Sequence, residues 1–101
     1  MLLSEPIHYL ATILSPDGAI REDALPDGDN DRVLRLYDLV GGHLEIVPIK
    51  GARYLVMNEG AKDKHLQANK AATDLAHEAE SIPDGDYIAG TVVVVAQAAL
   101  R

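Results

Sequence analysis

Residues 90–100, GTVVVVAQAAL, decide the fold, because they contain four consecutive valines, Val92–Val95. β-Branched side chains favour extended backbone, and a strand with one face in water would alternate apolar and polar residues. This run does not alternate. It therefore predicts a strand that is buried on both faces, either at the centre of a sheet or in an oligomer interface.

The remaining chain supplies partner strands and two helices. β-Branched and aliphatic runs between turn residues predict strands, and apolar residues at helical spacing predict helices. The strands are predicted at 7–14, 19–25, 43–49 and 52–58, and the helices within 30–42 and 69–81. The order is β(β)αββαβ, with 19–25 as the bracketed strand. It predicts an α+β fold, with one sheet of four or five strands and two helices, in a single domain over 1–101.

Both predicted helices have recognisable ends. For the first, Asp29 or Asn30 can act as the N-cap and Gly41 and Gly42 end the helix. Its predicted apolar face consists of Val33, Leu36, Tyr37 and Val40. The second helix has Asn69 as its predicted N-cap. Its narrow face consists of Ala72, Leu75, Ala76 and Ala79.

Turn residues separate the strands. Pro-Asp-Gly occurs three times, within 15–20, 25–30 and 82–87. In each copy Pro presets φ, Asp can bond nearby backbone and Gly tolerates positive φ, so each predicts a turn. Gly51 suits the left-handed position of a short hairpin loop. Pro48 cannot donate to a strand ladder, which places it at a sheet edge or strand end.

The charge balance argues against direct nucleic-acid binding. Sixteen acidic residues against nine Lys and Arg give a net charge of −7, which is opposite to that of a phosphate-backbone binder. The absence of cysteine excludes disulfides and zinc-thiolate sites. The N-terminal stretch lacks the basic start of a signal peptide, and no apolar run is long enough to span a membrane. A cytoplasmic protein is therefore expected.

No catalytic or metal motif stands out. The stretch 27–31 resembles the start of a calcium loop, but Arg32 occupies the position that requires Gly. The histidines, His8, His43, His65 and His77, show no metal-ligand spacing. Phosphate-loop and nucleophile-elbow motifs are also missing. We expect no metal and no cofactor, and a non-enzymatic role is favoured over an enzyme.

The segment between the strand at 52–58 and the second helix is the candidate site. It is longer than most strand-to-helix connections, and long connections often carry function. The predicted ligand-binding residues are Arg53, Asn58, Glu59, Lys62, Lys64 and Asn69. Asn58 and Glu59 would exchange hydrogen bonds with the ligand, and Lys62 and Lys64 would bind anionic groups. The alternative is that Asn69 only caps the helix and the charges are solvated.

Several short motifs together resemble those of a protein family that is found in bacteriophages, actinobacteria and mobile elements. This family is catalogued only as a domain of unknown function. These motifs are Val-Gly-Gly, Glu-x-Val-Pro, Asn-Glu-x-Gly, Leu-x-x-Asn and Gly-x-Val-Val-Val, over about residues 36–96. The matching positions are Gly41, Gly42, Glu45, Pro48, Asn58, Glu59, Gly60, Leu66, Asn69, Ala72 and Gly90. The resemblance implies a phage or mobile-element accessory protein in the host cytoplasm, and it implies no activity.

Three functions follow as hypotheses. The first is a non-enzymatic module that uses the loop 58–69 to bind a partner protein or a small polar ligand, as a homodimer built on the valine run. The second is an acidic DNA mimic or anti-defence protein that acts on a host DNA-binding protein. It would use Asp23, Asp27, Asp29, Asp31 and Asp38. The third is a small hydrolase or nucleotide-handling enzyme whose site involves Glu59 and His65.

Overall fold

The computed structural model describes residues 9–100, which form one five-stranded antiparallel sheet with two α-helices. The elements are β1 (Tyr9–Leu14), β2 (Ile20–Leu25), α1 (Asp29–Val40), β3 (Leu44–Ile49), β4 (Arg53–Asn58), α2 (Lys70–Glu78), β5 (Val92–Ala96) and a short 3₁₀-helix, η1 (Gln97–Leu100). This order confirms the predicted α+β fold, and the strand predicted at 19–25 is present as β2, one residue shorter at its start. The first two residues of the predicted strand 7–14 lie outside the described residues.

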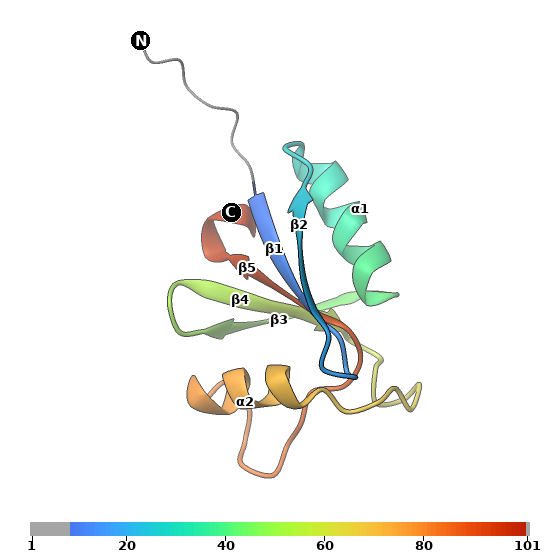
Figure 1. Ribbon diagram of the computed structural model, residues 1–101, viewed down its shortest axis with the longest axis vertical. Helices are drawn as coiled ribbons and strands as arrows, with labels where there is room; N and C mark the ends of the chain where they lie inside the picture. Colours follow the sequence, from blue (N-terminus) through green and yellow to red (C-terminus); the bar gives the residue numbers. More distant parts are fainter. Residues whose placement is uncertain (1–8, 101) are drawn as a thin grey trace.

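The valine strand β5 lies at the centre of the sheet, whose strand order is β2-β1-β5-β4-β3. Figure 1 shows α1 and α2 on opposite sides of this sheet. Val93 and Val95 belong to the core beneath α1, and Val92 and Val94 to the core beneath α2. All four valines are buried within the chain. The central-strand alternative is confirmed, and the valine run is not available as a dimer interface.

The strand prediction for 90–100 was too long at its end. The chain leaves β5 after Ala96 and forms η1. The Gln97 N–H donates to Ala52 O at 2.8 Å, and Ala99 O accepts from Arg32 Nε at 2.7 Å. These tertiary hydrogen bonds satisfy backbone groups of residues 97–100 outside the sheet. The strand can therefore end at Ala96, earlier than the sequence pattern predicts.

Helix α1 differs from its prediction in two details. Gly28 is the N-cap residue, so neither Asp29 nor Asn30 caps the helix. Val33 is 38% exposed, and Arg32 is buried in its place. The predicted face is right for Leu36 and Val40.

Arg32 is buried because its guanidinium is bonded on all sides. Nη1 donates to Pro26 O at 3.0 Å and to Asp27 O at 2.7 Å, and Nη2 pairs with the Asp29 carboxylate at 2.7 Å. The guanidinium carbon also lies 4.0 Å from the centroid of the Tyr9 ring. Together with the bond to Ala99 O, these contacts join α1, its preceding turn, β1 and η1.

The predictions for the C-terminus of α1, the N-cap of α2, the β3–β4 hairpin and Pro48 are confirmed. Gly41 ends α1 with a φ of 83°, which glycine adopts without steric cost. Asn69 caps α2 through its side chain. Gly51 takes a φ of 83° in the β3–β4 hairpin, and Pro48 lies in the edge strand β3. Among the helices of residues 9–100, none has the length and apolar character to cross a bilayer.

Candidate functional site

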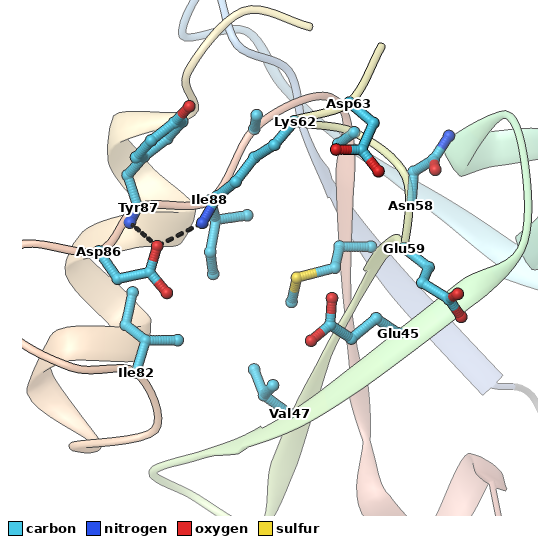
Figure 2. A pocket seen from close by; sticks show the side chains of 13 residues that line it. Glu45, Val47, Asn58, Glu59, Lys62, Asp63, Ile82, Asp86, Tyr87 and Ile88 are labelled. Atoms are coloured by element: carbon cyan, nitrogen blue, oxygen red, sulfur yellow. Dashed lines mark hydrogen bonds and ion pairs between the residues drawn. The ribbon is translucent and has the colours of Figure 1, made fainter. Parts of the chain in front are cut away.

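A pocket of about 220 Å³ opens beside the loop that connects β4 to α2. Figure 2 shows side chains of this loop and of β3 on one side and of the segment 82–88 on the other. Its lining comprises Glu45, Val47, Met57, Asn58, Glu59, Ala61, Lys62, Asp63, Ile82, Asp86, Tyr87, Ile88 and Ala89. Strands β3 and β4 contribute Val47 and Met57 from the sheet face that is packed against α2, since both side chains contact the core beneath this helix.

Backbone hydrogen bonds hold the loop 58–69 in a defined shape. Within it, the Leu66 N–H donates to Ala61 O at 3.0 Å. At its end the chain runs antiparallel to the segment before β5, where Ala68 and Ala89 form a β-bridge. The Asn69 N–H donates to Ile88 O at 2.7 Å. The two pocket walls are therefore joined at their base.

Lys62 and Asp86 join the two walls at the mouth of the pocket (Figure 2). The Lys62 ammonium pairs with the Asp86 carboxylate and lies 4.6 Å from the centroid of the Tyr87 ring. The hydrogen bond from Lys62, followed by that from the Tyr87 N–H, lowers the pKa of Asp86 from its ordinary value of 3.8. The hydrogen bond to Asp86 raises the pKa of Lys62 above 10.5.

This ion pair predicts a wide pH range of stability for the pocket mouth. Because the pKa of Asp86 is lowered in the folded state, its contribution to stability is fully present above about pH 3.8. This contribution is lost as the pH falls through the folded pKa. The contribution of Lys62 is present below 10.5 and is lost as the pH rises through its raised value. In a ¹³C NMR titration we expect the Asp86 carboxyl midpoint below 3.8, and Lys62→Met should raise it. A midpoint that Lys62→Met leaves unchanged would contradict the pairing.

Asn58 lies beneath the loop and supports it. Its side chain is buried, with Nδ2 donating to Val40 O at 3.2 Å and Oδ1 accepting from the Gly60 N–H at 2.8 Å. A Cβ atom at Gly42 would lie 2.9 Å from Asn58 Nδ2, so this close approach requires glycine. The end of α1 thus fixes the start of the loop through Asn58.

Asn69 is fully buried and lies at the other end of the loop. Its Oδ1 accepts from the Ala72 N–H at 3.1 Å, as an N-cap does. Its Nδ2 donates to Leu14 O at 3.0 Å and to Gly90 O at 2.9 Å. The side chain therefore joins α2, β1 and the start of β5, and it does not face the pocket.

The remaining predicted site residues are not all brought together. Glu59 lines the pocket and is exposed, with its N–H donating to His43 O at 2.8 Å. Lys64 is exposed, its ammonium lies close to Gly42 at the end of α1, and it is not part of the lining. Arg53 begins β4, about 17 Å along the strand from Asn58, and its Nε donates to Lys50 O at 2.9 Å.

A family model described as "Domain of unknown function (DUF3846)" matches residues 9–99. The chain belongs to the DUF3846 family. This match confirms the resemblance to a domain of unknown function and extends it beyond 36–96 on both sides. No curated protein and no solved structure gives a significant match to the chain.

Four polar residues that line the pocket of this DUF3846 chain were not among the predicted site residues. They are Glu45, Asp63, Asp86 and Tyr87. The Glu-x-Val-Pro motif contains Glu45, so its resemblance to the family was an available signal. The motif alone, however, does not indicate which other side chains line the pocket with Glu45. Asp86 and Tyr87 follow the third Pro-Asp-Gly, which the sequence indicates only as a turn.

The acidic residues of the DNA-mimic hypothesis lie elsewhere in the DUF3846 fold, and of the two residues of the enzyme hypothesis only Glu59 lines the pocket. Asp23 pairs with Arg35 at 2.6 Å. The hydrogen bond from Arg35, followed by that from the Ala24 N–H, lowers the pKa of Asp23. Asp29 pairs with Arg32, so two of the five acidic residues proposed for DNA mimicry are in ion pairs. His65 is exposed and does not line the pocket with Glu59. In the described part of the chain, no group of three or more His, Asp or Glu residues is arranged to hold a metal ion.

Proposed function

We propose that this protein is a non-enzymatic binding module that binds a partner protein or a small polar ligand in the pocket beside the loop 58–69. The observation that carries this proposal is the pocket itself. It is lined by Asn58, Glu59, Lys62 and Asp63 of the predicted loop, together with a second wall from 82–89. A concave site with apolar side chains and a few polar groups is the usual form of a ligand site.

The size of the pocket favours a small occupant. Its volume of about 220 Å³ is below the range of roughly 300–1,000 Å³ that drug-sized ligands occupy. A nucleotide or a dinucleotide cofactor would extend far outside it. One protein side chain or a small polar molecule is the better match in size.

The electrostatics of the pocket favour binding without catalysis. A general acid or base works best with a pKa near the working pH. Lys62 and Asp86 shift each other in the opposite sense, with the lysine pKa raised and the aspartate pKa lowered. Both groups therefore keep their charges at neutral pH, which suits recognition of a charged or polar group.

Ligand screening by ¹H–¹⁵N NMR tests this function. We expect at least one member of a library of small polar fragments to cause saturable shifts in residues 59–63 and 86–89, and to be recovered unchanged. The double variant Glu59→Gln with Asp63→Asn should alter affinity, whereas Glu22→Gln on the exposed strand β2 should not. Because Asn58 is buried, its replacement would report on folding instead. A library that leaves these resonances unmoved, or a fragment that is chemically converted, would contradict the proposal.

A further inference from the structure

The charges around the pocket are strongly unequal. Four carboxylates line it, and Lys62 supplies the one positive charge among the lining residues, for a formal charge of −3. Asp86 is paired with Lys62. The other three carboxylates, on Glu45, Glu59 and Asp63, form no ion pair within residues 9–100. An anionic ligand would meet repulsion in this pocket, and a cation would be attracted.

One wall of the pocket already holds an ammonium group. The Lys62 ammonium lies against the Asp86 carboxylate and 4.6 Å from the centroid of the Tyr87 ring. A carboxylate beside an aromatic face is a favourable environment for a cation. The chain's own lysine thus shows that the mouth of the pocket accepts a primary ammonium. A ligand ammonium of the same kind can compete with Lys62 there.

The inner part of the pocket is suited to an alkyl chain. Val47 from β3, Met57 from β4 and Ile82 line it; Met57 belongs to the core beneath α2, and Val47 and Ile82 pack against that core. Figure 2 shows the Glu45 carboxylate near Val47 on one side of the pocket, with Ile82 and Asp86 on the other side. A linear alkyl group could cover the apolar side chains while its charged end reaches a carboxylate.

We propose that the pocket binds a primary alkylammonium group, supplied either by a lysine side chain of a partner protein or by a free diamine. This inference rests on the proposed function and names its ligand class. The ammonium binds among Glu45, Asp63 and Asp86, and the alkyl chain lies on Val47 and Met57. Lys62 is then a competitor for the ligand, which reverses the anion-binding role that the sequence suggested for it.

Lys62→Met gives the decisive test, because the two roles of Lys62 predict opposite signs. Removal of its ammonium frees Asp86 and Tyr87 and makes the pocket more negative by one charge. We therefore expect this variant to bind alkylammonium probes about threefold to fivefold more tightly. An anion-binding pocket would lose affinity in the same variant. Lys64→Met, which removes the same charge from the loop outside the pocket lining, should change affinity much less.

The probes are Nα-acetyl-lysine methylamide, 1,5-diaminopentane, the uncharged Nα-acetyl-norleucine methylamide and inorganic phosphate. Binding is followed by ¹H–¹⁵N NMR at low salt. We expect the two amines to shift residues 59–63 and 86–89, and the effect to weaken in 0.5 M NaCl. Stronger binding of the lysine derivative indicates a partner protein as the source, and stronger binding of the diamine indicates a free diamine.

Glu45→Gln provides a second variant that does not touch the Lys62–Asp86 pair. We expect it to weaken amine binding about threefold to fivefold, with Glu22→Gln as the charge-matched control on β2. Tighter binding of phosphate or of the uncharged probe, or a loss of amine affinity in Lys62→Met, would overturn the proposed ligand class and leave the binding function standing. If no probe and no library fragment shifts the pocket residues, both proposals fail.

Discussion

Replacement of Arg32 by methionine is expected to lower the free energy of unfolding by about 3–5 kcal/mol. Methionine retains much of the apolar stem, but it removes every donor of the buried guanidinium. The buried Ala99 O would then lose its 2.7 Å hydrogen bond, and the carbonyls of Pro26 and Asp27 would lose theirs. A domain of this size has a total stability of only about 5–15 kcal/mol. The loss would therefore be a large part of the whole.

Urea denaturation measures this loss, and two other variants define its cause. Arg32→Lys keeps the charge, but a single ammonium cannot reach carbonyls in several directions, so we expect it to lose most of the same stability. Arg35→Met, one turn further along α1, removes an arginine that is 42% exposed and paired with Asp23. It should cost less than about 1 kcal/mol. If Arg32→Met stays within that limit as well, the buried guanidinium is not a major support of the fold.

Arg32 also illustrates what local sequence patterns leave out. Arginine is rarely buried unless it is paired, so its place on a helix next to acidic residues predicts an exposed side chain. Four of its five contacts are with three backbone carbonyls and the Tyr9 ring, none of which has a charge signature in the sequence. The predicted face therefore included Val33, whereas the structure turns the helix so that Arg32 is buried.

The fold itself was largely predictable because its main determinant is local. Four adjacent valines require apolar contacts on both faces, and in this chain a central strand with α1 on one side and α2 on the other provides them. The strand order was not predictable in this way. β1 and β5 are neighbours although they lie near opposite ends of the chain, and no periodicity in the sequence specifies such a pairing.

The candidate site was predictable on one wall only. The length and polarity of the loop 58–69 indicated Glu59 and Lys62, both of which line the pocket. Asp86 is 24 residues further along the chain from Lys62, in a turn whose sequence indicates a change of direction and nothing more. The sequence could not show that this carboxylate neutralises Lys62. The sign of the pocket charge, and with it the proposed ligand, therefore depended on the three-dimensional structure.

Asn69→Asp is expected to lower the free energy of unfolding by about 3–5 kcal/mol at neutral pH. Aspartate is as good an N-cap as asparagine, and a negative charge is favourable at a helix N-terminus. If capping of α2 were the main role of Asn69, this substitution would be neutral or slightly stabilising. The structure indicates a large loss, because the side chain is fully buried and its Nδ2 donates to both Leu14 O and Gly90 O. A carboxylate would lack these donors and would lie against two carbonyl oxygens.

The pH dependence of the Asn69→Asp variant separates these two roles. Burial next to two carbonyls should raise the folded pKa of the new carboxyl above its unfolded value of about 3.9. The folded state would then bind more protons than the unfolded state, so the variant should recover stability as the pH falls through that raised pKa.

Asn30→Asp, in the exposed first turn of α1, is the matched control and should stay within about 0.5 kcal/mol of the parent. Urea titrations of the parent and both variants between pH 7 and pH 4 measure the difference. Parallel pH profiles for all three proteins would show that Asn69 acts only as a cap. A stability gap that narrows toward acid in Asn69→Asp alone would show that its two donated hydrogen bonds hold β1, α2 and the start of β5 together.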